Sequence, residues 1–242
     1  MNRKQRAYLN AGIFFGTFVL LTILVLKVDV RPIGADGTNV GLSHLNGFFH
    51  FITRSHPYIY VVTELIKWIA IAVMASFIFL GVGVLIKNRT LKSIRGIACL
   101  FPIYAAMIPF YFIFNVFTVN CGPALFLGEN HPSNSFPSLT TMFCLVVFST
   151  AMLEWHKLFR NHKELLAKLD KVVLGLMGAT LLIRLIAGMN WFTDLLAAIL
   201  ITLSLLNLYK GLCIRIVYKT EQTEEERIRE EYLNARRSGG MR

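Results

Sequence analysis

Long apolar stretches separated by short polar segments dominate the hydrophobic pattern of this chain. Six such stretches occur, at residues 11–27, 58–86, 97–120, 137–153, 172–189 and 194–212. Each is long enough to cross the hydrocarbon core of a bilayer, which takes about 17–25 residues of α-helix. Backbone groups in lipid must be hydrogen-bonded within their own segment, so each stretch is expected to be a helix. The pattern predicts an all-α fold, a bundle of six transmembrane helices.

The first stretch follows three basic residues and therefore resembles the start of a signal peptide. These are Arg3, Lys4 and Arg6. No small-residue cleavage pattern precedes Asp29, and five further apolar stretches follow. We interpret residues 11–27 as a retained helix.

The distribution of Lys and Arg predicts how the bundle is oriented. Three of these residues precede the first stretch, four follow the second, five follow the fourth and eight lie from residue 210 onward, so that 20 of the 25 lie on one side of the membrane. Cytoplasmic loops carry the excess of positive charge in membrane proteins. We therefore expect both termini in the cytoplasm, in a multi-pass protein of the cell membrane.

This topology divides the chain into a transmembrane domain at residues 1–212 and a charged cytoplasmic tail at residues 213–242. The predicted outer segments are residues 28–57, 121–136 and 190–193. Within the first, residues 40–52 are apolar but interrupted by polar side chains, which is typical of a helix in the membrane interface; a simple lid over the bundle fits as well. In the tail, residues 221–237 alternate acidic and basic groups and predict a solvated helix.

Composition agrees with a membrane protein. Hydrophobic residues make up 55% of the chain and charged residues 16%, against roughly 25% charged in soluble domains. The net charge of +11 is explained by membrane orientation, so we expect no nucleic-acid partner. The four cysteines are far apart, without a C-x-x-C pair, and predict neither a metal site nor a cofactor.

Polar side chains inside the apolar stretches are candidates for function, because they are costly in lipid. Glu64 and Lys67 are three residues apart, which favours an ion pair on one helix face. Arg184 lies late in the fifth stretch and Asp194 opens the sixth. The two could form a structural clamp between helices, or Arg184 could hold an anion through its planar donor group.

The spacing of polar residues around Arg184 defines the third of three blocks in chain order, Arg184-x5-Asn190-x3-Asp194. The second block, Ser-Phe-Pro-Ser-Leu-Thr-Thr, occupies residues 135–141, and the first block is Asn115-x6-Gly122-Pro123. In family order and at family-like distances, these resemble the three motifs of the type 2 phosphatidic acid phosphatase (PAP2) superfamily, R-x5-H-x3-D, S-F-P-S-G-H-T and K-x6-R-P. The resemblance covers roughly residues 32–212 and implies a PAP2-like six-helix bundle.

The resemblance also assigns roles, and most of the catalytic positions are substituted. In the family the third-motif histidine attacks phosphorus, the following aspartate orients it, and the second-motif histidine protonates the leaving group. By position, the nucleophile becomes Asn190, with Asp194 retained, and the general acid becomes Thr140. The first-motif cations become Asn115 and Gly122.

These substitutions predict loss of the family mechanism. An amide nitrogen has no basic lone pair with which to attack phosphorus. A threonine hydroxyl cannot donate a proton as an imidazolium can, and a general acid alone contributes about 10²–10⁴ in rate. His131, in the loop before the second block, is a candidate for a displaced nucleophile, although no carboxylate stands at a fixed spacing to orient it.

The sequence therefore predicts a non-catalytic PAP2-type protein. Its pocket would bind a lipid headgroup or anion through Ser138, Thr140, Arg184 and Asn115, and keep an Asn190–Asp194 hydrogen bond. The expected ligand is a membrane lipid, either a phospholipid or an isoprenoid phosphate. Binding of another membrane protein is a second hypothesis. The alternative is a divergent lipid-phosphate or isoprenoid-diphosphate phosphatase with relocated catalytic groups. A transporter fits less well, because few charged groups lie within the spans.

Overall fold

The computed structural model describes residues 1–88, 95–125 and 131–214 and is all-helical apart from two isolated β-bridges. The long helices are α1 (Arg3–Lys27), α3 (Tyr60–Asn88), α4 (Arg95–Val116), α5 (Leu139–Leu158), α6 (Lys163–Ile186) and the unlabelled helix Phe192–Ile214. The short helix α2 spans Ser43–Thr53, and the 3₁₀ turns η1 and η2 span Ala35–Gly37 and Pro57–Ile59. The all-α class predicted from the sequence is confirmed.

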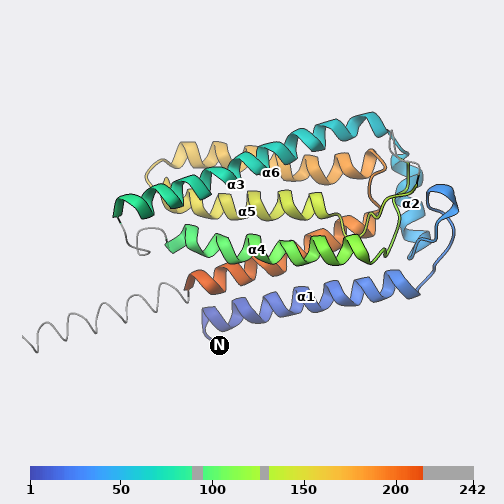
Figure 1. Ribbon diagram of the computed structural model, residues 1–242, viewed down its shortest axis with the longest axis horizontal. Coiled ribbons are helices and arrows are strands. Elements are labelled where there is room, and N and C mark those ends of the chain that lie inside the picture. The colour runs from blue at the N-terminus through green and yellow to red at the C-terminus, as the bar shows by residue number, and fades with distance from the viewer. Residues whose placement is uncertain (89–94, 126–130, 215–242) are drawn as a thin grey trace, which may run out of the picture.

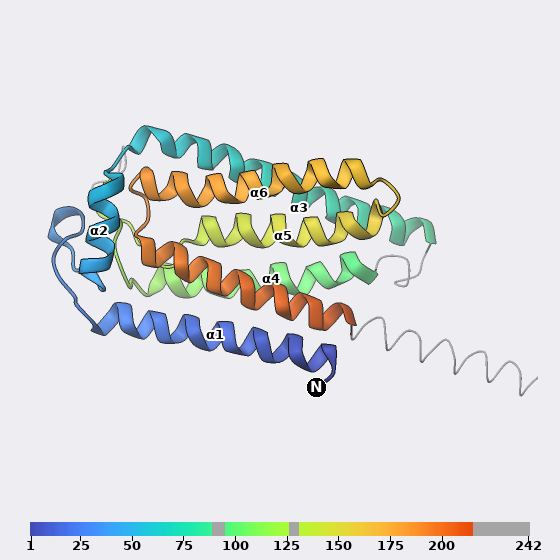
Figure 2. The same ribbon diagram turned by 180° about the vertical axis from the view of Figure 1, so that it is seen from behind.

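The six long helices run side by side and α2 lies across one end of the bundle (Figures 1 and 2). The N-terminus and the connection between α5 and α6 lie at the opposite end. α2 and the loops before α5 therefore cap a single end of the molecule. The second and third polar blocks identified in the sequence meet beneath this cap.

Helix α5 is the centre of the bundle. It packs against α3, α4 and α6, and 56% of its apolar stretch is buried, against 17% in α1 and α3. Small and branched side chains such as Val146 and Ala151 allow this close approach and are fully buried. The same core includes Ala198 and Ile201 from the helix Phe192–Ile214. The two helices that flank the third motif are thus fixed against α5.

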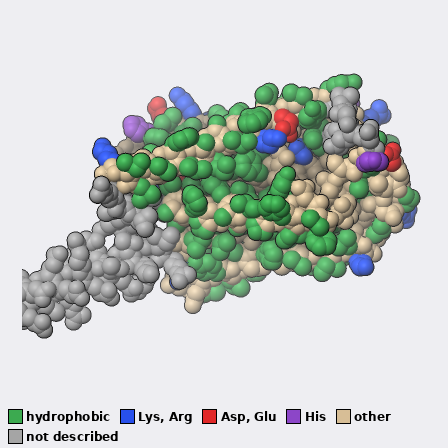
Figure 3. All heavy atoms as spheres, viewed as in Figure 1, with side chains coloured by type: hydrophobic (Ala, Val, Ile, Leu, Met, Phe, Trp, Pro, Cys, Tyr) green, Lys and Arg blue, Asp and Glu red, His purple; other side chains and the backbone are tan. Residues whose placement is uncertain are grey.

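The flanks of the bundle are covered by apolar side chains (Figure 3). Within the described residues, five helices are long and apolar enough to cross a membrane: α1, α3, α4, α5 and Phe192–Ile214. The chain is therefore a multi-pass membrane protein. Helix α6 is not among the five, and its sequence includes Lys168, Asp170, Lys171 and Arg184. The sixth span and the cytoplasmic position of the termini remain predictions.

The helices extend beyond several of the predicted stretches. α1 begins at Arg3 rather than residue 11, and α6 begins at Lys163 rather than residue 172, because polar and charged residues continue each helix past its apolar part. The helix predicted within residues 40–52 is α2, and its position in the membrane interface remains a prediction. The cytoplasmic tail, including the helix predicted at residues 221–237, lies outside the described residues. The division of the chain at residue 212 also remains a prediction.

Candidate functional site

The third block forms a tight connection between two helices. Arg184 lies in the last turn of α6, and the chain turns at Gly188, which has a φ of 71°. That left-handed conformation suits glycine because it lacks a Cβ atom. The Asp194 carboxylate accepts a hydrogen bond from the Trp191 backbone N–H at 2.8 Å and so closes the first turn of the next helix. The turn places Asn190 beneath the α2 end of the bundle.

The second block enters the same region at the start of α5. Ser138 is the N-cap residue of this helix, and its backbone N–H donates to the Asp194 carbonyl oxygen at 3.2 Å. The Ser138 and Thr141 hydroxyl oxygens are 2.7 Å apart and hydrogen-bonded. Both residues are almost fully buried. The second and third blocks, which were identified by their spacing in the sequence, are therefore in contact in the structure.

Asn190 is the centre of this buried cluster. Its Oδ1 accepts hydrogen bonds from Arg184 Nε at 2.7 Å and from Ser138 Oγ at 3.0 Å. Its Nδ2 donates to the Ser135 carbonyl oxygen at 2.8 Å. The Asn190 side chain is also close enough to the Asp194 carboxylate to interact with it through a side-chain hydrogen bond, as predicted from the sequence. Arg184 likewise binds Asn190, and no Arg184–Asp194 ion pair occurs in the described residues.

One buried polar atom of this cluster, Arg184 Nη1, has no hydrogen-bond partner in the described part of the chain. The Asp194 carboxylate interacts through side-chain hydrogen bonds with Asn120 and Ser135. The Asn120 side chain is fixed by its Oδ1, which accepts from the Gly41 N–H at 3.0 Å. Unsatisfied polar atoms in protein interiors commonly bind water or a ligand. The cluster thus offers one donor, on Arg184, to a small polar group.

Asn120 belongs to this cluster and was not predicted. It ends the third apolar stretch, where a polar residue is ordinarily interpreted as solvent-exposed. Asn115, which the first-motif spacing selected instead, is exposed on α4, and among the described contacts none joins it to the cluster. The prediction that Asn115 contributes to the pocket is therefore not supported by its position. The buried asparagine next to the site is five residues further along the chain.

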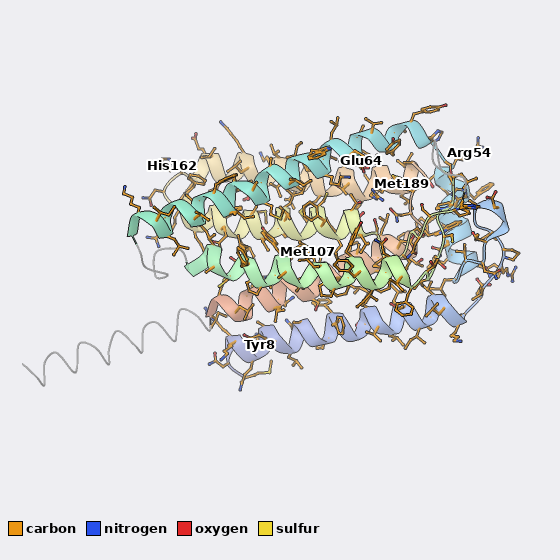
Figure 4. The ribbon with its side chains drawn as sticks, in the orientation of Figure 1. Tyr8, Arg54, Glu64, Met107, His162 and Met189 are labelled. Carbon is orange, nitrogen blue, oxygen red and sulfur yellow. The ribbon has the colours of Figure 1, made fainter. Side chains whose placement is uncertain are left out.

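Thr140 lies outside the hydrogen-bonded cluster. It is half-buried at the start of α5 and lines a cavity of about 730 Å³ between α3, α4 and α5. The cavity wall is almost entirely apolar, with Ile71, Met74 and Phe101 among its residues, and Lys67 reaches it from α3. Figure 4 shows the two helices that flank the cavity, with Glu64 labelled on α3 and Met107 on α4. Thr140 is therefore placed next to an apolar volume.

Glu64 and Lys67 form the ion pair predicted from their spacing on α3. The Glu64 carboxylate is close enough to act electrostatically on the Arg184 guanidinium. Of the remaining predicted candidates, His131 is exposed in its loop. A neighbouring carboxylate for it, Glu129, is outside the described residues. Within the described ranges, no group of three or more His, Cys, Asp or Glu side chains could hold a metal ion.

The α2 cap closes the site from the loop side. His50 of α2 packs its ring edge-on against Trp191, with centroids 5.4 Å apart, and burial lowers the pKa of this histidine. Asp29 accepts the His44 backbone N–H at 2.7 Å at the start of α2, and this bond lowers the pKa of the carboxyl to about 2. A second cavity of about 300 Å³ lies under α2, beside Trp191. His50 is thus a histidine near the third block that sequence spacing did not identify.

These features define a class of protein, an all-helical membrane protein with a buried polar cluster at one end of the bundle. No protein-family model and no curated protein matches the sequence. The fold is similar to the crystal structure of the first transmembrane PAP2 type phosphatidylglycerolphosphate phosphatase from Bacillus subtilis, with a TM-score of 0.60 and 14% identity. The match covers 86% of this chain and 97% of that one. The chain therefore has a PAP2-like fold, as the resemblance implied.

Proposed function

We propose that this protein is a non-catalytic member of the PAP2 superfamily that binds a membrane lipid at the retained site. The observation that carries this proposal is the hydrogen bonding of Asn190, the residue in the position of the nucleophilic histidine. Its amide oxygen accepts from both Arg184 and Ser138, and its amide nitrogen donates to a backbone carbonyl. All of these contacts hold helices together, and an amide offers no nucleophile for phosphorus.

The other groups that phosphoryl transfer needs are also missing from the site. Thr140 stands where the general acid would be and faces the apolar cavity. Asn115 and Gly122 replace the first-motif cations. Phosphoryl transfer depends on positioning and on neutralising charge on the transferred group, and Arg184 is the one motif cation that remains. The losses are not additive, yet together they leave little catalysis by this mechanism.

Lipid binding is supported by the cavity and by the polar groups around it. Ligand pockets are commonly apolar volumes of about 300–1,000 Å³ with a few polar groups that fix orientation. The cavity between α3, α4 and α5 has about 730 Å³ and carries Lys67 and Thr140 on its wall. The similar structure is that of a phosphatidylglycerolphosphate phosphatase, which favours a phospholipid or isoprenoid phosphate as the ligand here.

The test is phosphate release by the purified, detergent-solubilised protein, together with lipid binding measured by native mass spectrometry. Phosphatidate, phosphatidylglycerol phosphate and undecaprenyl diphosphate serve as substrates. We expect binding of at least one of them without phosphate release. A Thr140→His/Asn190→His variant should gain detectable release, because Ser138, Arg184 and Asp194 remain in place.

Turnover by the native chain would test the alternative of relocated catalytic groups. Release that is lost in Arg184→Ala, His131→Ala or His50→Ala would overturn the proposal and make the protein a phosphatase. Release that survives Arg184→Ala would come from elsewhere, since Arg184 is the central cation of the site. Failure to bind any of these lipids would contradict the lipid-binding role and leave a membrane protein partner as the remaining hypothesis.

A further inference from the structure

An ion pair lies on the lipid-facing surface of the bundle. The Glu64 and Lys67 side chains on α3 contact each other, and each is about one-third exposed, at 32% and 31%. Their neighbours on the helix are exposed and apolar, including Leu65 and Trp68. Figure 3 shows acidic and basic groups within the apolar surface over α3, where Figure 4 labels Glu64. Charged groups in such surroundings are costly unless they have a polar partner.

The position of the pair along α3 indicates what that partner is. α3 has 29 residues and is about 43 Å long at 1.5 Å per residue, longer than the roughly 30 Å hydrocarbon core. Lys67 is seven residues from the start of α3, about 10 Å along the helix. If α3 extends equally beyond both faces, the pair lies a few ångströms inside the hydrocarbon boundary, on the side of α2. A lysine side chain at this depth can reach lipid headgroups.

The same lysine also lines the apolar cavity. Lys67 is on the wall of the volume of about 730 Å³ between α3, α4 and α5, with Ile71, Met74 and Ile78 further along α3. A lipid whose headgroup meets Lys67 would therefore have a place for an apolar chain directly beneath. The headgroup contact and the chain contact come from the same face of the protein.

The charges around the site favour a headgroup with both signs of charge. Two acidic groups, Glu64 and Asp194, and two basic groups, Lys67 and Arg184, belong to this region, so their formal charges cancel. A dianionic phosphomonoester placed against Lys67 would also face the Glu64 carboxylate. A zwitterionic phosphodiester avoids this repulsion, because its phosphate can contact Lys67 while its ammonium group contacts Glu64.

We infer that the cavity holds a zwitterionic, amine-bearing phospholipid from the leaflet on the α2 side, with its phosphate on Lys67, its ammonium on Glu64 and a chain between α3, α4 and α5. This inference rests on the proposed lipid-binding function and names the class of lipid. Within that class, phosphatidylethanolamine has an ammonium group that can donate hydrogen bonds to the carboxylate.

The test is a titration of the purified protein with phosphatidylethanolamine and with phosphatidate of the same chains, monitored by native mass spectrometry. We expect the wild type to prefer phosphatidylethanolamine by roughly fivefold, the size of one partly exposed charge pair of about 1 kcal/mol. Glu64→Gln should remove or reverse that preference. Lys67→Met should weaken binding of both lipids, and Ile78→Trp should do so by filling the cavity.

Two further variants keep the result interpretable. The exchanged pair Glu64→Lys/Lys67→Glu retains both charges and should keep the preference for phosphatidylethanolamine even if a single substitution disturbs folding. Lys87→Met removes an exposed lysine from the far end of α3 and should change neither affinity. Both lipids binding equally, or phosphatidate binding better, would overturn this inference and leave the proposed function standing. If neither of these two lipids binds, and neither phosphatidylglycerol phosphate nor undecaprenyl diphosphate binds, the result would contradict both this inference and the proposed function.

Discussion

Gly188 determines how the chain leaves α6 and reaches Asn190. Its φ of 71° is unfavourable for other residues, and a Cβ atom there would lie 2.3 Å from Ser55 Oγ and 2.8 Å from Ser55 Cβ. Gly188→Ala should therefore destabilise the protein by about 1–3 kcal/mol. The measurement is the thermal unfolding midpoint in detergent, which should fall by several degrees for a chain of this size.

The control for this prediction is a glycine within α6. A Cβ atom added at Gly175 would meet no atom of a neighbouring element within 4 Å. Gly175→Ala should leave the midpoint unchanged or raise it slightly, because alanine is the better helix former. An equal effect of both substitutions would show that the turn at Gly188 does not constrain the site.

At the same scale, the sequence predicted some site residues and missed others for a physical reason. Ser138, Arg184 and Asp194 were identified by spacing, and the structure brings them together around Asn190. Spacing cannot show which side of a helix end faces inward. Asn115 and Asn120 are both amides near the end of one apolar stretch, and only the second is buried.

One buried asparagine, Asn46, joins helix α2 to Thr193 at the start of the last helix. Asn46 donates from Nδ2 to the Gly41 carbonyl at 2.8 Å and to Thr193 Oγ1 at 3.0 Å, and its Oδ1 accepts the Thr193 N–H at 3.1 Å. Asn46→Ala would leave that buried N–H unpaired, at a cost of about 2 kcal/mol or more. We expect faster amide hydrogen exchange across α2, measured by mass spectrometry.

Asn115→Ala is the matched control, because Asn115 is exposed on α4. It should leave exchange in α2 unchanged. Unchanged exchange in Asn46→Ala as well would mean that the apolar face of α2, and not this hydrogen-bonded contact, keeps the cap in place. That face includes Phe49, whose ring stacks on Phe192 with centroids 4.0 Å apart.

The elements themselves were largely predictable. Five apolar stretches correspond to α1, α3, α4, α5 and the helix Phe192–Ile214, because length and hydrophobicity alone require helices in lipid. The helix ends were less predictable: α1 and α6 continue into charged residues, which form helix as readily as apolar ones. The cap could be predicted as an interfacial helix, whereas its attachment through Asn46 could not, since nothing in the pattern marks one asparagine of α2 as fully buried.

The whole molecule has two chemically different ends. His162, at the connection between α5 and α6, lies at the end opposite Arg54 and Met189 (Figure 4). The end at His162 carries basic residues of the predicted cytoplasmic side, among them Lys157, Arg160 and Lys163. The positive-inside rule predicts that this end lies in the cytoplasm and the site on the other side. Arg184 and Asp194 would then face the extracytoplasmic leaflet.

This arrangement requires that α6 cross the membrane despite its charged first half. Its 24 residues measure about 36 Å, more than the roughly 30 Å hydrocarbon core. The test uses cysteines introduced singly at two exposed positions, Asn39→Cys and Asn161→Cys, in a chain whose four native cysteines are replaced by alanine. An impermeant maleimide should label Asn39→Cys in intact cells and Asn161→Cys only after permeabilisation.

Those two results together would make α6 a span, because it connects Asn161 to Asn190, and Asn190 is hydrogen-bonded to Ser138 at the α2 end. Labelling of Asn161→Cys in intact cells, with Asn39→Cys labelled as well, would place both ends of α6 on one side and contradict the six-helix topology. Labelling of Asn161→Cys alone would invert the orientation, and the candidate site would then face the cytoplasm. The lipid leaflet available to Lys67 would change with it.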